Sequence, residues 1–262
     1  MNEVLRAENI VKEFGSQRVL NGVSLTIDRG DFVSIVGSSG SGKSTLLTIL
    51  GGIDKPTSGK VFLGDREISA ASEKELALLR RTEIGFVFQF FNLAPYLTAE
   101  ENVLLPVMLA GRVSAEHRKK ADELMKYLGI DACKGKLPSK MSGGEQQRVA
   151  IARGLIFDPS VILLDEPTGN LDSRSSLEIM KLLKKINEEM GATIVQVTHS
   201  EFNAGFGNVI ISIRDGAITL SDSRQKSDGS EAQAESGAAC ATDTESSDTG
   251  TEKTDKYTVG NE

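Results

Sequence analysis

The chain has 262 residues, of which 39% are hydrophobic and 26% charged, so it is long enough to bury a substantial core in one large domain or two small ones. Its net charge of −7 is concentrated at one end, because residues 221–262 hold ten acidic and four basic residues, a net of −6, which leaves −1 for residues 1–220. The body therefore offers no broad basic face, and we expect no nucleic-acid partner.

Composition also argues against a secreted or membrane-spanning protein. The two cysteines, Cys133 and Cys240, are too few for a disulfide framework or a structural metal site, so free thiols are expected. Residues 1–6 lack the basic-then-apolar pattern of a secretion signal. The longest apolar stretch, residues 103–110, is interrupted by Pro106 and is too short to cross a bilayer. We expect a cytosolic protein unless another molecule holds it at a membrane.

The N-terminal third alternates strands with turns and helices. Residues 4–27 read as paired strands, and residues 32–36 form an apolar run that leads directly into a glycine-rich loop. A helix pattern follows the loop. Further strands are predicted at 61–63 and 84–88, with a polar helix at about 73–81 between them.

The middle of the chain has a different pattern of apolar residues. From about residue 92 to 138 no strand is predicted, and apolar residues recur at helical spacing, which indicates an all-helical subdomain, about residues 90–158, inserted into the strand-rich core.

Alternation then resumes, with a strand at 161–164, a helix at 173–190, a strand at 193–197 and a closing hairpin at 209–220. Apolar strands alternating with helices indicate a parallel sheet covered on both faces, in an α/β domain of residues 1–220. Residues 221–262 are polar and acidic, and we expect a disordered tail there.

A phosphate-binding loop is predicted between the strand at 32–36 and the helix after it. The loop fits the pattern G-x-x-x-x-G-K-[ST], and its backbone N–H groups and the following helix N-terminus favour phosphate oxygens. Lys43 is expected to reach the β- and γ-phosphates, and the Ser44 hydroxyl to bind Mg²⁺. The predicted loop residues are Gly37, Ser38, Ser39, Gly40, Ser41, Gly42, Lys43, Ser44 and Thr45.

Two adjacent carboxylates, Asp165 and Glu166, follow the apolar strand at 161–164. Ligands of open α/β sheets bind at the carboxyl ends of the strands, so both side chains are expected near the loop. We predict that Asp165 holds Mg²⁺ through water and that Glu166 is the general base for an attacking water.

A second glycine-rich segment spans residues 141–148, Met-Ser-Gly-Gly-Glu-Gln-Gln-Arg. Together with the first loop it resembles the signature of the ATP-binding-cassette (ABC) ATPases, L-S-G-G-Q, with Met141 and Glu145 as departures. The resemblance covers about residues 4–220 and implies a P-loop NTPase core, in which a RecA-like parallel sheet is joined by N-terminal antiparallel strands and an inserted all-α signature subdomain. It also implies that ATP is closed between two copies of the chain, a homodimer. The residues that would then contact the partner's ATP in trans are Ser142, Gly143, Gly144 and Glu145.

The same resemblance assigns roles to four further places. Gln89 resembles the glutamine of the Q-loop, which touches Mg²⁺ and water, and His199 resembles the switch histidine that contacts the γ-phosphate. Residues 169–172 match the D-loop of the dimer interface. Phe14 falls where the family stacks an aromatic ring on adenine, although core packing is an almost equal interpretation.

The segment 90–98 is rich in apolar and aromatic residues and, in transporter ATPases, lines the groove for a helix of a membrane permease. Within the superfamily the chain most resembles the MacB/LolD-like branch, which works with FtsX-like permeases. The resemblance implies an ATPase held by its permease at the inner face of the cell membrane. The alternatives are the ATPase of an importer, for example of amino acids, and a soluble ABC ATPase acting on nucleic acid or ribosomes.

Overall fold

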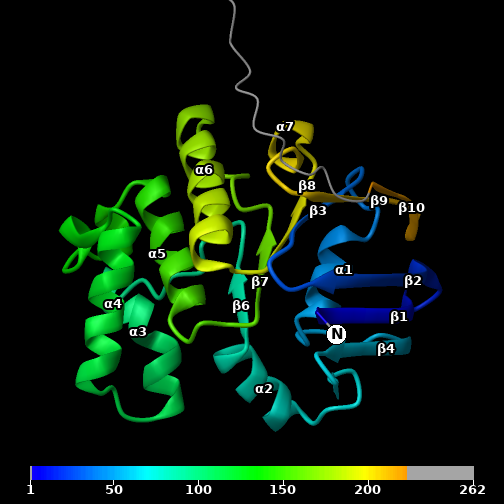
Figure 1. Ribbon diagram of the computed structural model, residues 1–262, viewed down its shortest axis with the longest axis horizontal. Helices are drawn as coiled ribbons and strands as arrows, with labels where there is room; N and C mark the ends of the chain where they lie inside the picture. The colour runs from blue at the N-terminus through cyan, green and yellow to red at the C-terminus, as the bar shows by residue number, and fades with distance from the viewer. Residues whose placement is uncertain (1, 223–262) are drawn as a thin grey trace, which may run out of the picture. The chain divides into compact units, whose positions relative to one another are not determined.

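The computed structural model describes residues 2–222 (Figure 1). The last strand runs to Asp222, two residues beyond the predicted end of the folded domain. The rest of the expected tail, together with Cys240, lies outside the described residues. None of the helices within residues 2–222 is both long enough and apolar enough to cross a bilayer.

The N-terminal strands form an antiparallel sheet, with strand order β2-β1-β4-β5. β1 and β2 pair along nearly their whole length, from Glu3 opposite Asp28 to Phe14 opposite Gln17. Buried apolar and exposed polar side chains alternate along the second half of β2, as expected for a sheet covered on one side, whereas irregular pairing interrupts the alternation in β1, where the neighbours Val4 and Leu5 are both buried. The strands are β1 (Glu3–Phe14), β2 (Gln17–Asp28), β4 (Ser58–Leu63) and β5 (Arg66–Glu67).

The second sheet has six strands in the order β10-β9-β3-β8-β7-β6. Its pairs are parallel except for β10, which closes the sheet as an antiparallel hairpin with β9. The central strands are mostly apolar and are buried along nearly their whole length because both faces are covered. The strands are β3 (Phe32–Val36), β6 (Ile84–Val87), β7 (Val161–Asp165), β8 (Ile194–Thr198), β9 (Val209–Arg214) and β10 (Ala217–Asp222).

Helices cover the second sheet and extend from it on one side (Figure 1). Between β6 and β7 the described chain contributes helices and no strand. Three of these helices begin with a capping box, at Thr98, Ser114 and Ser142. The α-helices are α1 (Lys43–Leu50), α2 (Glu73–Thr82), α3 (Ala99–Ala110), α4 (Ala115–Tyr127), α5 (Gly143–Leu155), α6 (Ser173–Met190) and α7 (Glu201–Ala204), and short 3₁₀ turns lie at η1 (Asp131–Cys133) and η2 (Pro138–Lys140).

The core divides between the two faces of the parallel sheet. In β7, Ile162 and Leu164 pack with the helices α3–α6, whereas Val161 and Leu163 pack with α1 and the N-terminal sheet. Because successive side chains of β7 point to opposite faces of the sheet, this one strand contributes to both halves of the core. The predicted class, a parallel α/β core with N-terminal antiparallel strands and an all-helical insertion, is confirmed.

Candidate functional site

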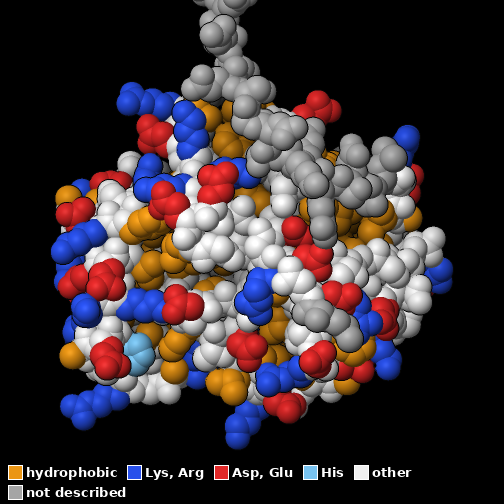
Figure 2. All heavy atoms as spheres, viewed as in Figure 1, with side chains coloured by type: hydrophobic (Ala, Val, Ile, Leu, Met, Phe, Trp, Pro, Cys, Tyr) orange, Lys and Arg blue, Asp and Glu red, His pale blue; other side chains and the backbone are white. Residues whose placement is uncertain are grey.

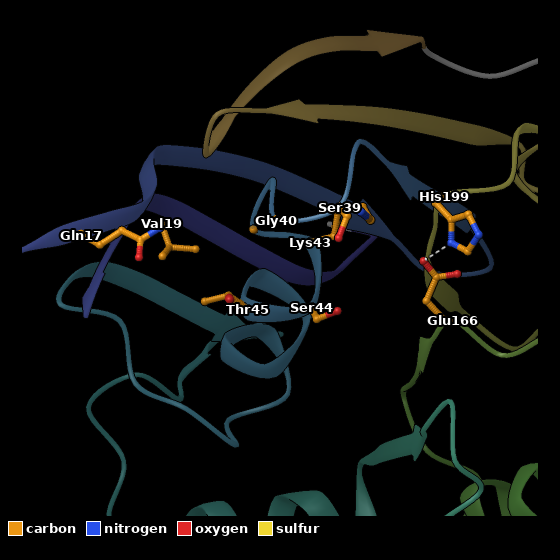
Figure 3. Close-up of a pocket in the computed structure, with 10 residues that line it drawn as sticks. Gln17, Val19, Ser39, Gly40, Lys43, Ser44, Thr45, Glu166 and His199 are labelled. Carbon is orange, nitrogen blue, oxygen red and sulfur yellow. Dashed lines mark hydrogen bonds and ion pairs between the residues drawn. The ribbon is translucent and has the colours of Figure 1, made fainter. Parts of the chain in front are cut away.

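A hollow of about 400 Å³ opens at the carboxyl ends of β3, β7 and β8, where the glycine-rich loop turns into α1 (Figure 3). This is the edge at which open α/β sheets bind ligands. Figure 3 shows residues of the loop and of α1 together with Glu166 and His199 from the neighbouring strand ends. The lining residues are Gln17, Val19, Ser39, Gly40, Gly42, Lys43, Ser44, Thr45, Glu166 and His199.

The conformation of the loop depends on two of its glycines. Gly42 has a φ of 98°, and a Cβ there would lie 2.8 Å from Leu20 Cδ2 and 2.9 Å from the carbonyl of Val19. A Cβ on Gly37 would lie 2.3 Å from the carbonyl of Ile213. Because backbone atoms cannot move away cheaply, these positions exclude larger residues. The loop is therefore packed between β2 and β9.

The loop presents groups suited to phosphate oxygens. The Lys43 ammonium donates to the carbonyls of Gly37 and Ser38, at 2.8 and 2.9 Å, and so lies across the loop. The Ser41 hydroxyl is buried and has no hydrogen-bond partner within the described chain. A buried, unpaired hydroxyl costs free energy, and a ligand oxygen at the loop would satisfy it. The loop residues thus fit the phosphates that the sequence predicts.

Ser44 and Asp165 meet across 121 residues of sequence, with the Ser44 hydroxyl donating to Asp165 Oδ1 at 2.8 Å. Burial raises the pKa of the Asp165 carboxyl, and the Ser44 hydrogen bond opposes that shift. Both are hard oxygen ligands of the kind that Mg²⁺ uses beside phosphate groups. Within residues 2–222 the structure contains no cluster of three or more His, Cys, Asp or Glu side chains that could hold a metal ion.

Glu166 lies beside His199, with Oε1 2.9 Å from the imidazole Nδ1 (Figure 3). Glu166 has a φ of 46°, a left-handed conformation that costs a non-glycine residue free energy. Its backbone N–H is bonded to the carbonyl of Val197 in β8, which helps to hold that conformation. The carboxylate is mostly buried and faces the hollow, where it can accept a proton from water.

Gln89 lies outside the residues that line the hollow and instead contacts the predicted D-loop. The Asn170 side-chain amide donates to the backbone carbonyl of Gln89 at 2.8 Å. A Cβ on Gly169 would lie 2.7 Å from Gln89 Nε2, so the glutamine side chain passes directly over that glycine. The structure therefore brings the predicted Q-loop and D-loop residues together.

The second glycine-rich segment does not line the hollow of its own chain. Ser142 is the N-cap of α5, and its hydroxyl accepts from the Glu145 backbone N–H at 3.2 Å. A Cβ on Gly143 would lie 3.0 Å from Leu171 of the D-loop. Within one chain this helix N-terminus thus packs on the D-loop, away from the residues that surround the phosphate-binding loop.

The residues that line the hollow differ in part from those that the sequence predicted. The Phe14 ring is 52% exposed but does not line the hollow, and the Lys12 ammonium lies 4.8 Å from its centroid. Two lining residues, Gln17 and Val19, were not predicted. Both follow the turn between β1 and β2, and the bulged pairing of that hairpin, which brings them to the loop, is not visible in the hydrophobic pattern.

Comparisons with known proteins agree with this geometry. Residues 20–169 match the ABC transporter family. The chain is 48% identical over 218 residues to the lipoprotein-releasing system ATP-binding protein LolD of Aquifex aeolicus, covering 83% of this chain and 97% of that one. It is 47% identical over 214 residues to the macrolide export ATP-binding/permease protein MacB of Burkholderia thailandensis, covering 82% of this chain and 33% of that protein.

A solved structure has the same fold. The ATP-binding cassette MJ0796, a protein of Methanocaldococcus jannaschii, was determined as a dimer in a post-hydrolysis state bound to ADP and Pi, and it superposes with a TM-score of 0.76 at 45% identity. The match covers 84% of this chain and 98% of that one. With its nucleotide-binding loop, paired carboxylates and signature segment on this fold, the chain belongs to the ABC transporter family of ATP-binding proteins and is an ATPase.

Proposed function

We propose that this chain powers a separate membrane permease of the LolC/LolE or MacB type by closing ATP between two copies of itself. The observation that carries the proposal is the separation within one chain of the signature segment at Ser142 from the hollow at Lys43. A second copy is then needed to bring the two together. The dimeric state of the similar cassette bound to ADP and Pi supports this arrangement.

In this proposal each site residue has a distinct task. The loop from Gly37 to Thr45 binds the phosphates of ATP, and Ser44 and Asp165, with Gln89 after a movement of its loop, hold Mg²⁺, which supplies charge neutralisation at the phosphates. Glu166 accepts the proton of the attacking water, and His199 orients Glu166 and contacts the γ-phosphate. Phe14 stacks on the adenine. Ser142, Gly143 and Gly144 contact the γ-phosphate from the partner, and Glu145 belongs to the same contact segment with its carboxylate turned away from the phosphate.

A surface beside the Q-loop fits a permease helix. Phe90 and Tyr96 are 72% and 91% exposed, although both are large aromatic residues. Earlier in the same segment, Phe86 and Phe88 stack with centroids 4.4 Å apart and line a smaller hollow together with Asn92. Exposed aromatic side chains beside a groove are typical of protein docking sites.

The names of the relatives support the proposed branch and location. LolD belongs to a lipoprotein-releasing system, and similar proteins act in macrolide and bacitracin export. We infer that this chain serves export or lipoprotein extrusion and sits on the inner face of the cell membrane through its permease.

Nucleic acid is a weaker candidate partner, because basic and acidic side chains are interspersed on the face shown in Figure 2. An importer remains the main alternative, since the same ATPase fold can serve either direction.

Dimerisation tests the first half of the proposal. Glu166→Gln keeps the size of the side chain but removes the base, so ATP binds and is not hydrolysed. Size-exclusion chromatography of this variant should show a dimer with ATP and Mg²⁺ and a monomer with ADP. A variant that stays monomeric at saturating ATP would refute the scheme, and chelation of Mg²⁺ should abolish turnover by the unmodified chain.

Affinity purification from membranes tests the second half. The full chain, recovered with ATP, should bring with it a permease of several membrane spans, and Phe90→Ser with Tyr96→Ser should lose it while ATP-driven dimerisation persists. Recovery of an importer permease would favour the alternative, and recovery of ribosomes or DNA would overturn the assignment.

A further inference from the structure

Three groups converge on the carboxylate of Glu145, the acidic residue in the signature segment. The Cys133 thiol donates to Glu145 Oε1 at 2.8 Å, and the Lys136 ammonium reaches the same oxygen at 3.2 Å. The second oxygen, Oε2, accepts from the Ser142 backbone N–H at 2.7 Å. Cys133 is 3% exposed, so the thiol end of this cluster is buried under α5.

These contacts fold the carboxylate back against its own helix. Oε1 points to the η1 turn and Oε2 to the helix N-cap. The Cys133 hydrogen bond is the largest of the causes that lower the pKa of Glu145 to about 2, whereas burial raises the pKa of the Cys133 thiol. At neutral pH the cluster therefore contains an ionised carboxylate and a neutral thiol donor.

The same arrangement orients Ser142. Its hydroxyl oxygen accepts from the Glu145 N–H at 3.2 Å, and Glu145 Oε2 accepts from the Ser142 N–H, so the two residues hold each other at the helix N-cap. A carboxylate turned outward at this place would release the Ser142 N–H. It would also meet another negative charge if a phosphate approached the helix N-terminus.

We propose that Cys133 and Lys136 are positioning residues for ATP-driven dimerisation: they restrain the Glu145 carboxylate so that the Ser142 hydroxyl and the N-terminus of α5 face the γ-phosphate held by the partner copy. This inference rests on the proposed function, because it needs the signature segment to act in trans. It explains how an acidic residue is accommodated beside an anion-binding helix end.

The test uses the full chain with Glu166→Gln, titrated with ATP and followed by size-exclusion chromatography or light scattering. Adding Cys133→Ala should raise the ATP concentration for half-maximal dimerisation roughly fivefold, because the freed carboxylate repels phosphate. Cys133→Ser keeps a donor of similar size and should stay within about twofold of the parent, a range too small to count as a lost contact. Lys136→Gln, which opens no core cavity, should weaken dimerisation in the same direction as Cys133→Ala.

Two further variants separate positioning from general stability. With Glu145→Gln also present, Cys133→Ala should have no additional effect, since no negative charge remains to restrain. Tyr127→Phe removes a hydroxyl that donates to Glu189 at 2.8 Å in the same helical region, and it should leave dimerisation unchanged.

Equal shifts for the Ala and Ser variants, or an Ala shift that persists beside Glu145→Gln, would overturn the inference. Failure of the parent to dimerise at all would instead refute the proposed function, and the inference with it.

Discussion

Nδ1 of His199 lies 2.9 Å from Oε1 of Glu166, and this pair joins the ends of β8 and β7 at the mouth of the phosphate-binding loop. The imidazole is largely exposed while the carboxylate is mostly buried, so the histidine can reach a bound ligand and still hold the glutamate. The pair supports a mechanism in which Glu166 is oriented before it accepts a proton.

His199→Ala should therefore lower kcat by about a hundredfold, with the KM for ATP changed little, because the loop residues that bind the phosphates are untouched. The chain contains one other histidine, which gives a matched control. His117 caps α4 through Ser114, and His117→Ala should cost some thermal stability but leave kcat within about twofold, since it touches no ligand. Equal losses of turnover in both variants would contradict the role of His199.

Asp165→Asn should abolish turnover but raise the stability of the folded protein. Burial raises the pKa of Asp165 above its usual value, so the folded state favours the protonated form and ionisation near pH 7 opposes folding. The amide can still accept from the Ser44 hydroxyl, so the substitution removes the unfavourable charge and keeps the contact. Without nucleotide, the melting temperature of the variant should exceed that of the parent at pH 7.

The pH dependence of this gain in stability provides the control. The gain should shrink as pH falls toward the ordinary pKa of an aspartate, where the parent carboxyl is protonated in both the folded and the unfolded states. Turnover should be lost at every pH, because the substitution weakens the oxygen ligand that Asp165 is proposed to give to Mg²⁺. A variant less stable than the parent at pH 7 would show that the carboxylate is favourably paired in the folded protein.

Long elements with strong patterns could be predicted from the sequence, whereas short elements could not. The helix predicted at 173–190 has those bounds in the structure, because an amphipathic pattern lies between the Asp172 N-cap and Gly191, which has a φ of 64°. β5 has two residues and α7 has four, too few to show a period. Pro106 interrupts the apolar pattern, but α3 continues through it, with Val103, Leu104 and Val107 buried on either side.

The candidate site also has parts that could be predicted from the sequence and parts that could not. From the position of each motif on its helix or strand the sequence predicted that Ser44 and Asp165 lie at one magnesium site, whereas it did not predict the direct hydrogen bond between them. The proposed action of Ser142 on a second copy came only from family resemblance, because no spacing within one chain shows which surfaces meet between chains. The role of Cys133 was missed, since a single cysteine in a helical region carries no pattern that points to Glu145.

Arg153 should stabilise the segment that follows the Q-loop. Its guanidinium donates to the carbonyls of Phe91 and Asn92 at 2.8 and 2.6 Å, and both residues have left-handed φ values of 61° and 49°. Arg153→Ala should lower the free energy of unfolding by about 2 kcal/mol, because the two charge-assisted hydrogen bonds that hold this left-handed segment in place are lost. Urea denaturation measures this loss. Arg112→Ala, at an exposed position, should change stability by less than about 0.5 kcal/mol, and an equal loss there would contradict the assignment.

Gly169 should control turnover through Gln89. A Cβ at this position would lie 2.7 Å from Nε2 and 3.1 Å from Cδ of the glutamine, so Gly169→Ala must push that side chain from its place. The displaced atoms belong to a flexible side chain, and the fold should survive. Since Gln89 is proposed to position Mg²⁺ and water, its misplacement should lower the rate more than the affinity. We therefore expect kcat to fall by about tenfold to a hundredfold while the KM for ATP stays within about twofold.

A second glycine shows whether the added methyl group alone is responsible. A Cβ on Gly135 would meet no atom within 4 Å, and the backbone there does not require a positive φ, so Gly135→Ala should leave kcat and stability nearly unchanged. Combining Gly169→Ala with Gln89→Ala should restore room for the methyl group but not the lost contact. The double variant should then turn over no faster than Gln89→Ala alone. If Gly169→Ala were as active as the parent, Gln89 would not need its observed position for hydrolysis.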